Sequence, residues 1–137
     1  MKNVFLDTNI LVDIIADRQP FSQYAIEIFG ASEQGKVKLF TSSPSIATTH
    51  YLLKKFVDEN SLRVIILELL EFITVIAVDI EVISESLKSI HKDFEDAIQI
   101  ECALSHSGMN FIVTRNSRDF EKSSIEVLSP EDMCQRL

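Results

Sequence analysis

The sequence predicts an α/β fold, specifically a three-layer α/β/α sandwich with a parallel sheet at its centre. Short apolar and β-branched runs alternate with longer segments in which apolar residues recur every three or four positions. Apolar runs of this kind are typical of strands buried on both faces, and strands that alternate with helices form parallel sheets covered by helices. The predicted strands are Val4–Leu6, Val37–Phe40, Thr74–Val78, Phe111–Thr114 and a short Glu126–Leu128.

The helices are predicted from apolar periodicity and from residues that favour helix ends. Ser43 and Pro44 predict an N-cap followed by proline at the first helical position, and Gly35 predicts the end of the preceding helix. The predicted helices lie over about 10–17, 22–34, 43–55, 61–72, 79–90 and 93–108, and from 129 onward.

Length and composition predict one globular domain over residues 1–137. The chain has 137 residues, of which 46% are hydrophobic, so it can bury a sizeable core and is not disordered. It has 13 Lys and Arg against 21 Asp and Glu, a net charge of −8. This balance excludes a protein that coats nucleic acid through a broad basic surface, but it leaves room for a small local site.

Cysteine usage and hydropathy predict a cytoplasmic protein. Cys102 and Cys134 are too few for a disulfide framework or a zinc site. The N-terminal apolar run meets Asp7 too early for a signal peptide, and charged residues interrupt the most apolar window, 64–78. We therefore expect neither secretion nor a membrane span.

Polar residues follow the predicted strands, where ligands bind in open parallel sheets. The first strand is followed by Asp7, Thr8 and Asn9. The fourth strand ends in Thr114 and is followed by Arg115, Asn116 and, after a short turn, Asp119. Asp93 and Asp96 lie three positions apart at a helix start, hence on one face of its first turn.

Several aspartates at one end of a sheet repel one another unless a cation binds between them. Ligands that are all oxygens favour Mg²⁺ or Mn²⁺, and such an ion supports hydrolysis of a phosphodiester bond. Simpler roles stay open for single residues: Asp7 and Asp93 suit helix starts, Asp96 suits the surface, and Asp119 and Asn116 favour turns.

Three segments, LDTNILVD, DFEDAIQIECA and FIVTRNSRDF, resemble the hallmark segments of the PIN-domain nucleases, in the same order. The resemblance covers nearly the whole chain and is nearest to small bacterial proteins related to VapC-like toxins. It implies a parallel α/β/α fold, Mg²⁺- or Mn²⁺-dependent cleavage of RNA, and an antitoxin protein as partner if the chain is a toxin.

The resemblance also assigns site residues. It makes Asp7 the first acid, Asp96 the third and Asp93 an accessory acid, while the fourth position falls on Asn116 or Asp119. We favour Asp119 as the charged group, with Asn116 helping through water or phosphate. Catalysis is thus expected from Asp7, Asp96 and Asp119, with Asp93 added for metal binding.

The chain departs from the family at the second acid, where Thr48 stands in place of the usual Glu. A threonine hydroxyl can bond a metal-bound water but carries no negative charge, so we expect weaker metal binding. The nearby His50 has no placed partner, and we expect it to be an ordinary partly solvated histidine.

Basic residues near these positions suggest contacts with the RNA backbone, because arginine binds phosphate through two hydrogen bonds. The predicted RNA-binding residues are Arg115, Arg118, Lys54 and Lys55. The apolar stripe of helix 61–72 is wide, which predicts that Leu62, Ile66 and Leu69 are partly exposed and cover a partner protein or a second copy in a homodimer.

Two function classes therefore remain. The retained acids favour a metal-dependent ribonuclease, whereas Thr48 and the net negative charge favour a PIN-fold module that binds RNA or a protein without cutting. A haloacid-dehalogenase-like phosphatase is excluded because it needs Asp-x-Asp where this chain has Asp7-Thr8-Asn9, and a response-regulator receiver fits poorly.

Overall fold

A computed structural model describes all residues, 1–137, and contains one five-stranded sheet in the order β3-β2-β1-β4-β5. Every neighbouring pair of strands is parallel. The parallel sheet predicted from the alternating pattern is therefore confirmed. The strands are β1 (Lys2–Leu6), β2 (Val37–Ser42), β3 (Ile73–Ile76), β4 (Phe111–Val113) and β5 (Glu126–Leu128).

Seven α-helices and one 3₁₀ helix connect the strands, close to the predicted ranges. They are α1 (Thr8–Ala16), α2 (Ser22–Glu33), α3 (Ser43–Leu53), α4 (Glu59–Leu69), α5 (Ile80–Lys88), α6 (Phe94–Ser105), the 3₁₀ helix η1 (Ser117–Phe120) and α7 (Pro130–Gln135).

Two helix ends show how local chemistry sets these boundaries. Gly35 follows α2 with a φ of +75°, a backbone conformation that suits glycine and confirms the expected helix end. At the start of α3 the predicted cap is one residue off. The hydroxyl of Ser42, not of Ser43, accepts a hydrogen bond from the Ser45 N–H, because β2 runs on to Ser42.

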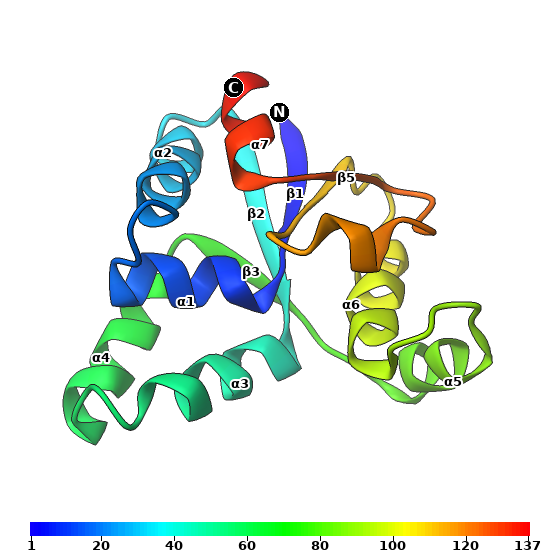
Figure 1. Ribbon diagram of the computed structural model, residues 1–137, viewed down its shortest axis with the longest axis horizontal. Coiled ribbons are helices and arrows are strands. Elements are labelled where there is room, and N and C mark those ends of the chain that lie inside the picture. The colour runs from blue at the N-terminus through cyan, green and yellow to red at the C-terminus, as the bar shows by residue number, and fades with distance from the viewer.

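The sheet is covered by helices on both faces, as a three-layer sandwich requires. Successive residues of a strand point to opposite faces, so Val4 and Leu6 face one side and Phe5 faces the other. Figure 1 shows α1 and α2 on one side of β1 and β2, with α5 and α6 on the other.

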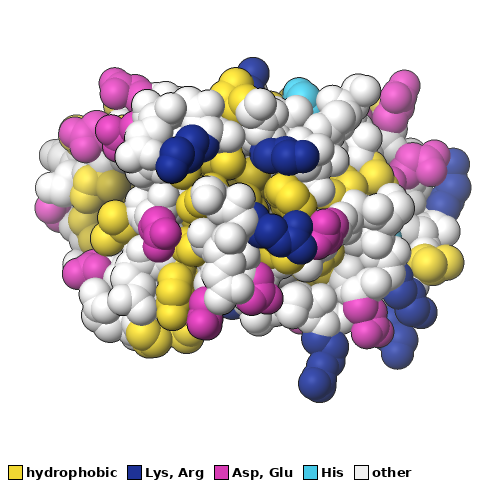
Figure 2. All heavy atoms as spheres, turned by 90° about the horizontal axis from the view of Figure 1, so that it is seen from above, with side chains coloured by type: hydrophobic (Ala, Val, Ile, Leu, Met, Phe, Trp, Pro, Cys, Tyr) yellow, Lys and Arg dark blue, Asp and Glu magenta, His cyan; other side chains and the backbone are white.

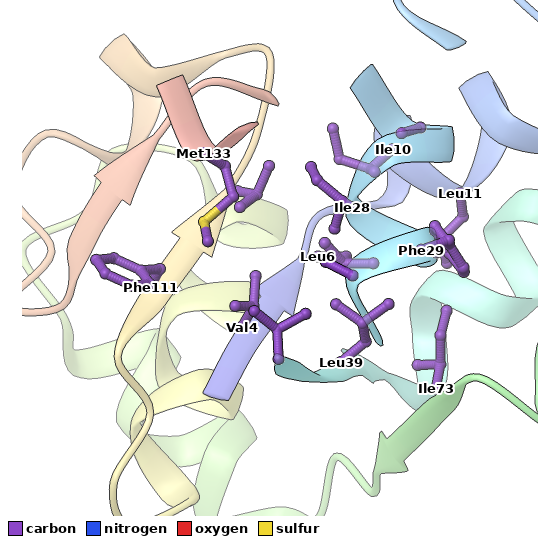
Figure 3. Packing of buried hydrophobic residues seen from close by; sticks show 14 of the residues in the cluster. Val4, Leu6, Ile10, Leu11, Ile28, Phe29, Leu39, Ile73, Phe111 and Met133 are labelled. Atoms are coloured by element: carbon purple, nitrogen blue, oxygen red, sulfur yellow. The ribbon is translucent and has the colours of Figure 1, made fainter. Parts of the chain in front are cut away.

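The larger core lies between the sheet and helices α1, α2 and α7. Figure 3 shows Leu6 of β1 and Leu39 of β2 pointing toward Ile28 and Phe29 of α2, with Met133 of α7 nearby. On the opposite face, a second cluster joins the sheet to α5, α6 and η1. The two clusters thus hold helices against both faces of the sheet.

A third cluster overturns one sequence-based expectation. Leu62, Ile66 and Leu69 of α4 are buried, Leu62 completely. Leu62 and Ile66 pack in this cluster with residues of α1 and α3, and Leu69 joins the larger core. The prediction that these three residues are partly exposed is wrong. The outward residues of α4 are Val64 and Leu67, 53% and 66% exposed.

The parallel sheet gives the molecule two different edges. In Figure 1, β1 and β2 run downward and end where α1 and α3 begin, at what is here called the lower edge. Because every strand pair is parallel, all five strands have their carboxyl ends along this edge of the sheet. Figure 2 views the opposite edge, where the strands begin, and shows basic and acidic side chains interspersed among hydrophobic ones. None of the helices is both long and apolar enough to cross a lipid bilayer.

Candidate active site

Among the acids at the lower edge of the sheet, Asp7 accepts the most hydrogen bonds. It caps α1 directly after β1, and its Oδ1 accepts a hydrogen bond from the Thr8 N–H at 2.8 Å. Its Oδ2 accepts from the Thr114 hydroxyl at 2.7 Å and from the Asn9 amide at 3.3 Å. Neighbouring parallel strands β1 and β4 end side by side, so residues 107 positions apart meet here.

The Asp7 carboxyl group is buried, which raises its pKa above the ordinary value of 3.8. Hydrogen bonds from Thr114 and Thr8 lower the pKa and offset part of this effect, whereas the nearby charge of Asp119 raises it. Asp7 does cap a helix, as the simpler interpretation expects, but its second oxygen is bound by a threonine from another strand.

Thr114 and Asn9 connect the two chain segments that follow β1 and β4. The Thr114 hydroxyl oxygen accepts from the Asn116 N–H at 3.0 Å, while the Asn9 side-chain oxygen accepts from the Arg115 N–H at 3.4 Å. These predicted supporting residues therefore hold the backbone of the turn that leads to Asp119. The exposed Asn116 contributes its N–H to this network and lines the adjacent cleft.

Asp93 and Asp96 open α6 on the far side of the cleft. Asp93 is the N-cap, and its Oδ1 accepts from the Asp96 N–H at 3.0 Å. Partial burial and then the charge of Asp93 raise the pKa of Asp96 to about 6; Asp7, Asp119 and Glu95 raise it further. Burial is thus the main cause of the pKa shift, and the negative charges around Asp96 add to it.

Asp119 lies in η1, where its N–H donates to the Asn116 carbonyl at 2.9 Å, so it takes part in the turn that follows β4. Its side chain is exposed. Its charge raises the pKa of both Asp7 and Asp96. The convergence of these three carboxylates around one cation stays a prediction.

A cleft of about 520 Å³ lies at the carboxyl ends of the strands, between α1, α3 and α6. Asp7 and Asp96 both line it, as does Thr48. It is also lined by residues that the sequence did not single out, among them Arg18, Phe94, Glu95 and Gln99.

A second cavity, of about 270 Å³, adjoins the first at Asp96, which lines both. Its walls carry only polar and charged residues. They are His91, Lys92, Asp93, Asp96, Arg118, Asp119, Glu121 and Lys122. Arg118 therefore lies beside the predicted acids, and Lys92 and Lys122 are further cations that sequence reasoning missed.

A buried polar network lies under the cleft beside Thr48. The Ser45 hydroxyl contacts the Thr8 hydroxyl at 2.8 Å and receives a hydrogen bond from the Gln99 Nε2 at 2.8 Å. Ser45 is fully buried and Gln99 is 8% exposed. The sequence offers one signal for Gln99: it lies three residues after Asp96, so it shares that face of α6.

The structure revises the assignment of Arg115 to RNA binding. Its Nε and Nη2 donate to Asp13 at 2.7 and 3.2 Å, and its guanidinium stacks 4.2 Å from the Phe21 ring centre. Asp13 is only 1% exposed, so this arginine neutralises a buried carboxylate of α1. Arg18, whose Nε is 3.9 Å from Asp13, reaches the cleft instead.

The other predicted basic residues lie further away. Lys54 and Lys55 are exposed just beyond α3 and line neither cavity, and the Lys54 Nζ lies 4.8 Å from the Tyr51 ring centre. Their contact with RNA stays a prediction. His50 is partly exposed, as expected, and its Nε2 lies 2.8 Å from a carboxylate oxygen of Glu59.

The residues at this edge suit a hard divalent cation in type and charge. They are carboxylates and hydroxyls. Burial is the main cause that raises the pKa values of Asp7 and Asp96, and nearby negative charges raise them further. No three side chains of Asp, Glu, His or Cys are already arranged closely enough to hold a metal ion. The roles of Asp7, Asp93, Asp96 and Asp119 in metal binding stay predictions.

Comparisons with known proteins agree with this architecture. The chain is 31% identical over 139 residues to Ribonuclease VapC1 of Aquifex aeolicus, covering 98% of this chain and 95% of that protein. DNA-bound VapBC from Salmonella typhimurium has a chain with a TM-score of 0.69 and 18% identity, covering 95% of this chain and 99% of that one. A toxin–antitoxin complex from Klebsiella pneumoniae has a TM-score of 0.68 and 24% identity, covering 93% and 97%.

The family assignment follows from the sequence match and the fold together. The family model of the PIN domain matches residues 3–118, which include every predicted acid except Asp119. The match thus spans the sheet from β1 to β4 and the cleft at its edge. The chain belongs to the PIN-domain family.

Proposed function

We propose that this protein is a metal-dependent endoribonuclease that hydrolyses phosphodiester bonds in RNA and acts as the toxin of a toxin–antitoxin pair. The observation that carries the proposal is the cleft in which Asp7 and Asp96 lie together at the carboxyl ends of the strands. The 31% identity to a protein named Ribonuclease VapC1 supports the same reaction.

Asp7 and Asp96 are the residues we propose to hold Mg²⁺ or Mn²⁺, with Asp93 and Asp119 at the rim. Such a cation, when bound, polarises the phosphodiester and lowers the pKa of an attacking water. The chain supplies the orientation: hydrogen bonds from Thr8 and Thr114 fix both oxygens of Asp7. A fixed carboxylate binds a cation without losing side-chain freedom at that moment.

Cations and an aromatic ring around the acids suit a bound RNA strand. Arg18 lines the main cleft and Arg118 the adjoining cavity, so both can bind phosphates on either side of Asp96. Phe94, 44% exposed at the start of α6, offers a face for base stacking. Arg18 and Arg118 form a small local group of cations and not a broad basic surface, which agrees with the net charge of −8.

We also propose an antitoxin protein as partner, since the similar solved chains come from toxin–antitoxin complexes. An apolar hollow of about 490 Å³ between α1, α2 and α4 suits side chains of such a partner. Its apolar lining is Ile14, Ile15, Ile26, Phe29, Ile65, Leu69 and Phe72.

The test is cleavage of a labelled single-stranded RNA across titrations of Mg²⁺ and Mn²⁺. We expect the wild type to cut only with metal, and Asp7→Asn and Asp96→Asn to lose at least a hundredfold in rate while remaining folded. Asp132→Asn, which changes an exposed acid of α7, is the matched control and should cut normally. Cleavage that survives Asp7→Asn unchanged would place the activity elsewhere.

Thr48 favours a second candidate, a PIN-fold module that binds RNA without cutting it. Thr48 lines the cleft but carries no charge, so the site has one anion fewer to hold the cation. We expect Thr48→Glu to lower the metal concentration needed for half-maximal cleavage about tenfold. If the wild type and Thr48→Glu are both inert at saturating Mn²⁺, the binding module replaces the nuclease.

A further inference from the structure

Under the cleft, the side chains of Gln99, Ser42, Ser45 and Thr8 form a chain of hydrogen bonds. Counting the hydrogens shows which group donates to which. A serine hydroxyl has one hydrogen to donate and two lone pairs that accept. The Ser45 oxygen receives one hydrogen bond from the Gln99 Nε2 at 2.8 Å and one from the Ser42 hydroxyl at 3.0 Å. Both lone pairs of Ser45 are then used.

The single hydrogen of Ser45 must therefore go to its third neighbour, the Thr8 hydroxyl oxygen, 2.8 Å away. Thr8 accepts that hydrogen bond, and its own hydrogen cannot point back at Ser45. Thr8 is partly exposed and lines the cleft beside Asp7 and Asp96. Its O–H is thus left as a donor for a molecule in the cleft.

Gln99 sets the direction of the network through the orientation of its side-chain amide. Its Oε1 is buried and has no hydrogen-bond partner, while its Nε2 is bound to Ser45. The direction of the network therefore depends on this orientation of the Gln99 amide, and replacing Gln99 by Glu tests it. Thr49 provides a contrast in the same helix, because its hydroxyl donates to the Ser45 backbone carbonyl and takes no part in the chain of hydroxyls.

We propose that Ser45 and Gln99 are positioning residues that fix the Thr8 hydroxyl as a hydrogen-bond donor to a phosphate oxygen of the bound RNA strand. The inference rests on the proposed function. An anionic phosphate oxygen accepts such a bond more strongly than a neutral group does, and a hydroxyl fixed in advance need not reorient when the strand binds.

The experiment combines sulfur substitution of single phosphate oxygens in the RNA with substitution of single residues in the protein. After the cut site of a 12-nucleotide single-stranded RNA is mapped with Mn²⁺, each non-bridging oxygen at the cut phosphate and its two neighbours is replaced in turn by sulfur, a poor acceptor. For the wild type, we expect one of these substitutions to reduce kcat/KM about tenfold. For Ser45→Ala and Thr8→Val, the same sulfur substitution should reduce kcat/KM less than twofold. In Ser45→Ala the Thr8 hydroxyl is no longer oriented, and in Thr8→Val it is absent.

Gln99→Glu is the sharpest variant because it keeps the shape but replaces the Nε2 donor by an oxygen. Ser45 must then donate to Glu, Thr8 must donate to Ser45, and the sulfur effect should vanish. Thr49→Val removes a buried hydroxyl of the same helix outside the network, and it should keep the full tenfold sulfur effect. A sulfur effect of wild-type size in Gln99→Glu or Ser45→Ala overturns the proposal.

The same sulfur series measured on binding separates this inference from the proposed function. Dissociation constants for the uncut RNA are measured by fluorescence anisotropy without metal. If the wild type binds the RNA but does not cut it at saturating Mn²⁺, the nuclease proposal fails, and the positioning proposal stands only if the sulfur effect appears in the dissociation constant and vanishes in Gln99→Glu. If the wild type neither binds the RNA nor cuts it at saturating Mn²⁺, both proposals fail.

Discussion

Arg115 illustrates how a single residue can take a role that its neighbours in the sequence do not suggest. It follows β4 beside the predicted acids, where an arginine suits phosphate, yet its guanidinium binds the buried Asp13 through two hydrogen bonds. The pair ties the turn after β4 to α1. This helps to keep the residues after β4 next to those after β1, where the Arg115 N–H donates to Asn9 and the Thr114 hydroxyl donates to Asp7.

Replacing this arginine should destabilise the protein in a pH-dependent way. Burial raises the pKa of Asp13, and Arg115 lowers it, so Arg115→Met raises it further. A carboxyl group with a raised folded pKa favours folding below its unfolded value near 3.8, and that contribution is lost as the pH rises through the folded pKa. We expect the variant to lose about 3 kcal/mol of unfolding free energy at pH 8 and clearly less at pH 5.5.

Urea unfolding at the two pH values measures this difference. Arg118→Met is the matched control, since Arg118 is exposed and forms no ion pair, and it should change the free energy of unfolding by less than about 0.5 kcal/mol at either pH. Equal losses for Arg115→Met at both pH values would contradict the assignment of Asp13 as the group left without a cation.

At the scale of elements, the start of α6 combines a structural and an electrostatic role. Asp93 caps the helix through a hydrogen bond from the Asp96 N–H, and its charge contributes to the raised pKa of Asp96. The two roles can be separated because asparagine keeps the capping oxygen but not the charge.

We expect Asp93→Ala to lose about 1 kcal/mol of unfolding free energy and Asp93→Asn to match or exceed the wild type in metal-free buffer. Asp58→Ala is the control: Asp58 caps α4 with the same geometry, at 3.1 Å from the Ser61 N–H, but it lies outside both cavities. Asp58→Ala should lose as much unfolding free energy as Asp93→Ala, but its affinity for Mn²⁺, measured by titration calorimetry, should equal that of the wild type. A large loss of stability in Asp93→Asn would refute this division of roles.

The two faces of α4 give a second prediction at this scale. Leu62→Ala should cost about 2–5 kcal/mol of unfolding free energy, because Leu62 is fully buried in the cluster with α1 and α3. Leu67→Ala, on the outer face, should change it by less than about 0.5 kcal/mol. Denaturant titration of both variants checks this, and comparable losses would show that Leu67 is covered in solution.

At the scale of the whole molecule, we expect the buried acids at the carboxyl edge of the sheet to oppose folding, and a cation bound at the proposed site to offset this effect. Asp7 is buried with a raised pKa, and Asp96 is surrounded by like charges. A ligand that binds only the folded protein stabilises it by RT ln(1 + [L]/Kd), which is about 2.7 kcal/mol at one hundred times Kd. We therefore expect the proposed metal site to couple cation binding to the stability of the entire domain.

We expect Mn²⁺ to raise the melting temperature of the wild type in proportion to log concentration above Kd, and to leave that of Asp7→Asn unchanged. Without metal, Asp7→Asn should be at least as stable as the wild type, because it removes a buried charge. Differential scanning calorimetry over a Mn²⁺ series measures both, with Asp132→Asn as a control that should follow the wild type. A metal-induced shift that persists in Asp7→Asn would remove Asp7 from the metal site.

Much of the fold could be predicted from the sequence, because its signals are local. Apolar runs near Val4 and Val37 predict buried strands from their own composition, and caps such as Asp79 and Ser129 act on N–H groups three residues away. Parallel pairing then follows from the alternation of strands and helices. The same logic placed Asp7, Thr114 and the start of α6 at one edge of the sheet.

Only the tertiary structure decided how these residues are used. Whether Leu62 faces the core or solvent depends on where α4 packs, and whether Arg115 binds phosphate depends on Asp13, which is 102 positions away in the chain. Neither Ser45 nor Gln99 was assigned a role from the sequence. They matter because α1, α3 and α6 bring the side chains of Thr8, Ser45 and Gln99 into contacts of 2.8 Å. Sequence patterns record the preferences of each segment, whereas burial and hydrogen-bond partners arise only when distant segments meet.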